Sequence, residues 1–120
     1  VLNAGSSSIK FALFKDQAIL ETVFRGAIDG IGTEHSKFVV NGSAADTLAR
    51  YFPIPEHVTA VHVLVDWLIE RLPAATLDAI AYRVVYAGPG YAAPQAIDAA
   101  MQARCGKGCI GRNPTLTLAV

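Results

Sequence analysis

The residues best suited to chemistry lie at the start of the chain, in the string Asn3-Ala4-Gly5-Ser6-Ser7-Ser8-Ile9-Lys10. This string is typical of a short apolar strand start, a turn of small residues and a second strand. Gly5 permits backbone conformations closed to other residues, the serines offer hydroxyl donors, and consecutive N–H groups in such a turn can form an anion-binding nest. The turn is therefore predicted to bind phosphate.

Ser8 and Lys10 are two residues apart, which places both side chains on the same face of an extended strand. A hydroxyl and an ammonium group could then reach one anion together. The string has neither the G-x-x-x-x-G-K-S/T spacing of a Walker P-loop nor a G-x-G-x-x-G fingerprint. Because glycine and serine are ordinary turn formers, the same string could also do no more than connect two strands.

The elements that must position this turn begin with a β-meander. Ile9–Phe14 and Ala18–Phe24 are rich in β-branched and aromatic residues and are separated by three polar residues, which predicts a hairpin. Ser36–Val40 ends at Asn41-Gly42, a turn signal that makes a third antiparallel strand plausible.

A helix and a further strand follow. Apolar residues recur at spacings of three and four from Val58 to Leu72, between Pro55 and Pro73, and predict an amphipathic helix. Asp78–Ala87 is apolar almost throughout, which suits a strand buried on both faces and placed parallel to an earlier one. The order predicts an α/β or α+β domain.

The composition is that of a neutral globular protein. The 120 residues are 52% hydrophobic and 17% charged, with a formal net charge of zero, which indicates one compact soluble domain. Without clusters of Lys or Arg, the chain lacks the electrostatic footprint that attracts nucleic acid or an anionic membrane surface. No apolar run approaches the roughly 20 residues that span a bilayer, and the opening lacks a secretory signal. We expect a cytoplasmic setting, without nucleic acid or membrane as partner.

The two cysteines and three histidines of the chain receive no chemical role. Cys105 and Cys109 have C-x-x-x-C spacing without the second pair or the His partners that a zinc site needs, so two free thiols are favoured. His35, His57 and His62 are interpreted as surface or helix-face residues.

Two ordered motifs resemble a known family. Val1–Phe14 (VLNAGSSSIKFALF) resembles the N-terminal signature N-x-G-S-S-S-x-K of acetate kinases and their short-chain carboxylate kinase relatives. Arg83–Gly88 resembles the H-R-V-V-H-G-G segment of the same family, at about its usual distance from the first motif. The resemblance covers residues 1 to about 103.

This resemblance implies a fold and an activity. The fold is a ribonuclease-H-like α/β domain of the sugar kinase, Hsp70 and actin superfamily, with a mixed sheet and flanking helices. The activity is reversible phosphoryl transfer from ATP to acetate or another short-chain carboxylate, giving ADP and acetyl phosphate, with magnesium bridging the phosphates. A full-length family member is expected to be a homodimer.

The resemblance also implies roles for single residues. Asn3 would help to place Mg²⁺, and Gly5, Ser6, Ser7, Ser8 and Lys10 would line the path of the ATP phosphates. Arg83 would hold the carboxylate or acyl phosphate, since a guanidinium matches a pair of oxygens. As an alternative, Arg83 could form a partly buried ion pair with Asp78 or Asp98.

The chain departs from the family pattern at several positions. Tyr82 and Tyr86 stand where the family string has histidines, and Ala87 stands where it has glycine. Tyrosine keeps a hydroxyl but does not titrate near neutral pH, and Ala87 adds a Cβ, so the histidine and glycine roles of the family are not assigned to these positions.

The likeness divides the chain into two parts. Residues 1–103 form an incomplete N-terminal acetate-kinase-like domain, and residues 104–120 form a divergent tail, which we attribute to a shifted reading frame or a truncation near Arg104. The chain alone is expected to be catalytically silent. The alternatives are a phosphate- or nucleotide-binding module without turnover and an inactive remnant.

Overall fold

A computed structural model describes residues 1–15, 18–19, 21–42, 47–72, 77, 79–83 and 96–100. These residues belong to two compact units, Val1–Arg83 and Val84–Val120, and each unit is described by itself. In the second unit the described residues are 96–100, with helical backbone at Ala99 and Ala100. Within all these ranges, no helix is long and apolar enough to cross a membrane.

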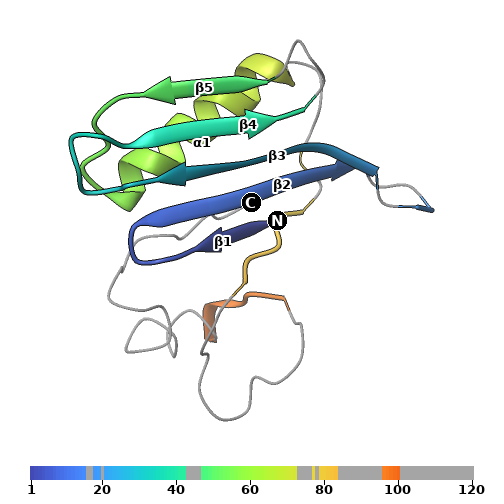
Figure 1. The fold of residues 1–120 in the computed structure, drawn as a ribbon. Helices are drawn as coiled ribbons and strands as arrows, with labels where there is room; N and C mark the ends of the chain where they lie inside the picture. Colours follow the sequence, from blue (N-terminus) through green and yellow to red (C-terminus); the bar gives the residue numbers. More distant parts are fainter. Residues whose placement is uncertain are drawn as a thin grey trace. The chain divides into compact units, whose positions relative to one another are not determined.

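The first unit contains a single antiparallel sheet (Figure 1). Its strands lie in chain order and are β1 (Leu2–Ala4), β2 (Ser8–Lys15), β3 (Glu21–Asp29), β4 (Lys37–Asn41) and β5 (Leu48–Tyr51). The predicted hairpin is confirmed as β2 paired with β3, and the predicted third strand is confirmed as β4 paired with β3.

Two features of the sheet differ from the sequence-based expectation. β3 begins later than predicted and continues to Asp29, with Ile28 fully buried near its end. β5 was not predicted, because its residues are mostly exposed and carry no apolar alternation. β5 is held by its pairing with β4, including a Lys37–Tyr51 pair in which the ammonium nitrogen lies 5.5 Å from the ring centre.

The predicted amphipathic helix is confirmed as α1 (His57–Arg71), which lies across one face of the sheet (Figure 1). Its buried residues are Ala60, Val61, Leu64 and Trp67, spaced as one helical stripe. The helix closes with a hydrogen bond of 2.8 Å from the Leu72 amide to the Leu68 carbonyl oxygen. Pro73 follows, and a proline cannot donate the next helical hydrogen bond.

The core between sheet and helix is built around Trp67, which is 4% exposed. Phe11 from β2, Phe24 from β3 and Phe38 from β4 surround it, with ring centres 6.2, 5.1 and 5.9 Å from the indole. The Phe24 and Phe38 rings meet Trp67 edge to face, an arrangement favoured by the ring quadrupoles. Three neighbouring strands therefore share one aromatic partner on the helix.

The last predicted strand is described only at residues 79–83. Tyr82 forms a parallel bridge with Leu2, through hydrogen bonds from the Leu2 amide to Ala81 O (2.7 Å) and from the Arg83 amide to Leu2 O (2.9 Å). The predicted parallel placement is confirmed at this bridge, which lies outside the five antiparallel strands. The predicted burial on both faces is wrong for these residues, since Ala81 and Arg83 are exposed and Tyr82 is half-buried. Asp78 and residues 84–87 lie outside the described part.

A buried hydroxyl joins the loops at the end of the sheet beside the β1–β2 turn. Ser36 is fully buried, and its Oγ lies 2.8 Å from Gly30 O and 3.2 Å from Thr33 O, to which it can donate. The same Oγ accepts a hydrogen bond of 3.1 Å from the Ile54 amide. One side chain thus connects the β3–β4 loop to the segment that leads into α1.

We predict that Ser36→Ala destabilises the chain by about 1–3 kcal/mol, because it leaves buried polar groups without their partner. Urea unfolding followed by the fluorescence of Trp67, the one tryptophan of the chain, measures this change. Ser7→Ala is the matched control, since Ser7 is exposed. Equal stability of the two variants would contradict the role given to Ser36.

Gly26, in the middle of β3, is required by close packing. Phe11 is its direct cross-strand partner, and a Cβ added at Gly26 would lie 2.6 Å from Phe11 Cζ and would also collide with the Val39 carbonyl oxygen. The Phe11 ring therefore occupies the space that a side chain on Gly26 would fill.

We expect Gly26→Ala to cost about 1–3 kcal/mol of stability, because the Phe11 ring and the β4 backbone must both move. Gly5→Ala is the comparison, since a Cβ there would meet only Ser8 Oγ at 3.2 Å. That variant should stay within about 0.5 kcal/mol of the parent chain. Thermal unfolding of both variants decides the point, and an unchanged Tm for Gly26→Ala would refute it.

Candidate functional site

The predicted phosphate turn, Gly5–Ser8, links β1 to β2. It is closed by a hydrogen bond of 2.7 Å from the Gly5 amide to Ser8 O, directly beyond the Ala4–Ile9 pair. Gly5, Ser6 and Ser7 are exposed and Ser8 is half-buried. The turn thus presents its backbone and hydroxyl groups to solvent at the end of the sheet.

Two contacts from distant parts of the chain hold this turn. The Ile31 amide donates to Ser7 O at 3.0 Å, and His57 Nε2 lies 2.8 Å from Gly5 O. His57 received no role from the sequence, because its contact with Gly5 spans 52 residues and leaves no local pattern. Its position at the start of the predicted helix is the one feature of the sequence that could have drawn attention to it.

The residues predicted to act together share one face of the sheet. Along β2, Ile9 and Phe11 are buried beneath α1, so Ser8 and Lys10 belong to the opposite face, called here the open face. Asn3 is the direct cross-strand partner of Lys10 and therefore lies on the open face as well. The predicted common face of Ser8 and Lys10 is confirmed.

Arg83 lies beside these residues at the edge of β1. Because Tyr82 is paired with Leu2, the next residues along each strand, Arg83 and Asn3, belong to the same face. Arg83 is exposed and makes no ion pair with any residue in the described ranges. The alternative of a partly buried ion pair is therefore not seen there. Ser8, Lys10, Asn3 and Arg83 therefore share the open face, near the end of the sheet that carries the Gly5–Ser8 turn.

Gly5 does not use the conformational freedom that the sequence suggested. Its φ lies outside the left-handed region, in which the structure places Gly30 and Gly32, with φ of 72° and 90°. A Cβ at Gly5 would lie 3.2 Å from Ser8 Oγ, a side-chain atom that can move.

Tyr82, one of the departures from the family string, lies on the other face of the sheet, with Leu2. Burial raises the pKa of its phenol above the ordinary value of 10.0, because desolvation disfavours the phenolate. Tyr82 is therefore neutral at physiological pH. The contribution of the neutral Tyr82 phenol to the free energy of unfolding is therefore present below pH 10. It is lost as the pH rises through the raised pKa.

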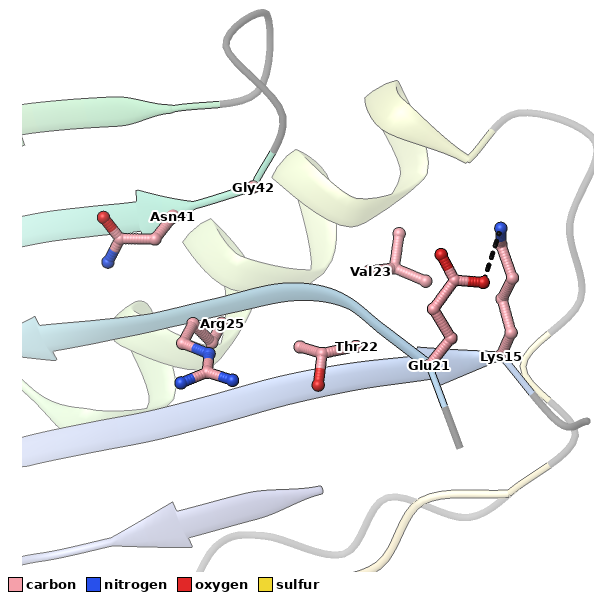
Figure 2. A pocket seen from close by; sticks show the side chains of 7 residues that line it. All are labelled: Lys15, Glu21, Thr22, Val23, Arg25, Asn41 and Gly42. Carbon is pink, nitrogen blue, oxygen red and sulfur yellow. Dashed lines mark hydrogen bonds and ion pairs between the residues drawn. The ribbon is translucent and has the colours of Figure 1, made fainter. Parts of the chain in front are cut away.

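A shallow depression lies at the opposite end of β2 and β3 (Figure 2). Lys15 and Glu21 form an exposed ion pair of 3.3 Å on one side of it, and the cross-strand partners Arg25 and Asn41 line the other. Lys15 is seven positions after Ser8 along β2, roughly 23 Å of extended chain. This depression contains none of the predicted site residues.

Comparison with known proteins decides the family. The acetokinase family model matches residues 1–107. The chain belongs to this family. It is 39% identical to an acetate kinase of Bacillus mycoides over 104 residues, which cover 82% of this chain and 25% of that protein. It is 35% identical to an acetate kinase of Rhodopseudomonas palustris over 98 residues, which cover 78% of this chain and 25% of that protein.

Two solved kinase structures have the same fold. A propionate kinase from Francisella tularensis superimposes with a TM-score of 0.76 at 27% identity, covering 88% of this chain and 28% of that one. An acetate kinase from Porphyromonas gingivalis gives a TM-score of 0.74 at 22% identity, with the same coverage. The predicted fold class, a mixed α/β domain of the actin-like ATPase superfamily, is confirmed.

This chain spans about a quarter of the length of these relatives and corresponds to their N-terminal part. Within the described ranges, no group of three or more His, Cys, Asp or Glu side chains could hold a metal ion. Cys105, Cys109, Tyr86, Ala87 and the divergent tail from residue 104 to 120 lie outside those ranges. The boundary at residue 103 stays a prediction.

We predict that Lys10→Ala weakens the binding of inorganic phosphate by this chain about tenfold, because it removes a charge-assisted partner on the open face. Lys15→Ala is the matched control on the same strand, since Lys15 is paired with Glu21 at the far end. Titration followed by NMR measures both. Equal weakening by the two variants would show that general charge, and not this end of the sheet, attracts the anion.

Proposed function

We propose that this chain is the phosphate-handling part of a kinase that transfers a phosphoryl group from ATP to acetate or another short-chain carboxylate, reversibly, to give an acyl phosphate. The observation that carries the proposal is the placement of Asn3, Ser8, Lys10 and Arg83 on one face of the sheet, near the Gly5–Ser8 turn. Membership of the acetokinase family supports the same function.

The chemistry that these residues supply is positioning and neutralisation of charge. Phosphoryl transfer spreads negative charge over the equatorial oxygens, so fixed donors and cations account for most of the catalysis. The Ser6, Ser7 and Ser8 hydroxyls and the Lys10 ammonium group make no hydrogen bond to another described residue. Their donors are therefore open to a phosphate that approaches the turn.

Arg83 is assigned to the acceptor. Its planar guanidinium can hold two carboxylate oxygens at once, which orients the attacking oxygen as well as binding it. Arg83 is one register step from Leu2 at the edge of β1, and Lys10 lies across β1 from it. A carboxylate on Arg83 and a phosphate on the turn would then share the open face.

The residues present fit a magnesium ion that is bound mainly by nucleotide and water. Asn3 is the assigned protein ligand, and its amide oxygen is of the hard type that Mg²⁺ prefers. Asn3 is half-buried beside Lys10, with no side-chain hydrogen bond to any residue in the described part. When bound, the ion would neutralise charge on the phosphates.

The chain by itself is proposed to bind phosphate without turnover. In-line transfer needs groups on both sides of the phosphates, and the chain spans about a quarter of the length of its curated relatives. Incubation of the 120 residues with ATP, Mg²⁺ and acetate should give no acetyl phosphate above background. Sustained ATP-dependent turnover would overturn this proposal.

We predict that Arg83→Ala, made in a full-length acetokinase that contains this sequence, lowers kcat/KM for acetate about 10- to 100-fold, as expected for loss of a charged hydrogen-bonding partner. Arg83→Lys should recover little of the loss, because an ammonium group cannot form the paired contact. The KM for ATP should change much less.

Arg50→Ala is the control for this experiment. Arg50 is an exposed arginine of β5, the edge strand opposite β1. Its acetate kinetics should match those of the parent enzyme. If a stably folded Arg83→Ala enzyme kept normal acetate kinetics, the carboxylate role of Arg83 would be wrong.

A further inference from the structure

His57 makes a directional contact with the predicted phosphate turn. Its Nε2 lies 2.8 Å from the Gly5 carbonyl oxygen, and a carbonyl oxygen can only accept a hydrogen bond. Nε2 must therefore carry the proton in this contact. His57 is half-buried at the first position of α1, so the donor is fixed to a helix that is itself packed on the sheet.

This bond fixes more than the Gly5 oxygen. The Gly5 carbonyl and the Ser6 amide belong to one planar peptide unit, and no cis peptide bond occurs in the described ranges. In a trans peptide the C=O and N–H groups point in opposite directions. By holding Gly5 O, His57 therefore directs the Ser6 N–H away from α1 and out of the turn.

A glycine at this position makes such a contact useful. Rotation of the Gly5–Ser6 peptide would exchange its carbonyl and amide groups, and glycine has the smallest steric barrier to the backbone angles involved. A rotated peptide would present an oxygen, which repels phosphate, where the amide stood. The bond from the Gly5 amide to Ser8 O and the bond from the Ile31 amide to Ser7 O involve other peptide units of the turn. The Gly5–Ser6 peptide is instead bonded to His57.

We propose that His57 is a positioning residue of the phosphate turn: it holds the Gly5–Ser6 peptide so that the Ser6 amide is directed at a bound phosphate. This proposal rests on the proposed function of the Gly5–Ser8 turn. A donor that is already oriented costs no reorganisation when the anion arrives, which is the property that electrostatic stabilisation requires.

The experiment uses the 120-residue chain and three variants. His57→Phe keeps a flat ring and removes the donor, while His57→Gln keeps an amide donor that can reach the place of Nε2. His62→Phe is the control, since His62 is an exposed histidine of the same helix. NMR relaxation gives the order parameter of the Ser6 N–H, and titration with inorganic phosphate gives the affinity.

The expected order parameter of the Ser6 N–H is near the rigid value of about 0.85 in the parent, His57→Gln and His62→Phe chains. In His57→Phe it should fall towards about 0.6. Phosphate affinity should weaken about tenfold in His57→Phe, stay within about threefold in His57→Gln, and not change in His62→Phe. A role limited to stability would lower the free energy of unfolding and leave the Ser6 N–H order parameter of the folded chain unchanged.

Two results would overturn the proposal: a Ser6 N–H equally rigid in His57→Phe, or equal loss of affinity in the Gln and Phe variants. Absence of phosphate binding in the parent chain would instead overturn the proposed function of the turn. In that case the order parameters alone decide whether His57 fixes the peptide. The two failures are therefore distinguishable.

Discussion

The buried Ser36 hydroxyl is the interaction on which the arrangement of the site depends. It connects Gly30 and Thr33 of the β3–β4 loop to the Ile54 amide, three residues before α1 begins. From this point one branch leads through Ile31 to Ser7, and the other leads through α1 to His57 and Gly5. Both external supports of the Gly5–Ser8 turn therefore start from this junction, where the buried Ser36 hydroxyl acts together with the backbone bond from the Gly32 amide to Ile54 O.

The aromatic core has a complementary function. Trp67 contacts rings from β2, β3 and β4, and this contact fixes the helix on one face of the sheet. Because side chains alternate along each strand, burying Ile9 and Phe11 on the helix side forces Ser8 and Lys10 to the open face. Hydrophobic packing thus orients polar residues that do not themselves take part in it.

Much of this arrangement could be predicted from local patterns. The hairpin, β4 and α1 follow from periods of two and of three to four residues, and the common face of Ser8 and Lys10 follows from their spacing alone. β5 could not be predicted in this way, because Leu48–Tyr51 has one half-buried residue and three exposed ones. It exists through backbone pairing with β4, which no pattern within its own sequence specifies.

The long-range contacts of the Gly5–Ser8 turn could not be predicted from the sequence either. His57 is 52 residues from Gly5, and only the packing of α1 brings them together. The expected burial of the 78–87 strand on both faces was wrong at Ala81 and Arg83, which are exposed. The left-handed freedom of Gly5 was inferred from its residue type, whereas the structure gives a left-handed φ to Gly30 and Gly32.

The most direct test of the account is a crystal structure of a full-length acetokinase containing this chain, with Mg²⁺ and a non-hydrolysable ATP analogue. The account predicts terminal phosphate oxygens at hydrogen-bond distance, about 2.7–3.1 Å, from the Ser6 amide and from the Ser8 or Lys10 side chains. It also predicts that His57 still contacts Gly5. A nucleotide whose phosphates lie away from the Gly5–Ser8 turn, or on the opposite face of the sheet, would contradict it.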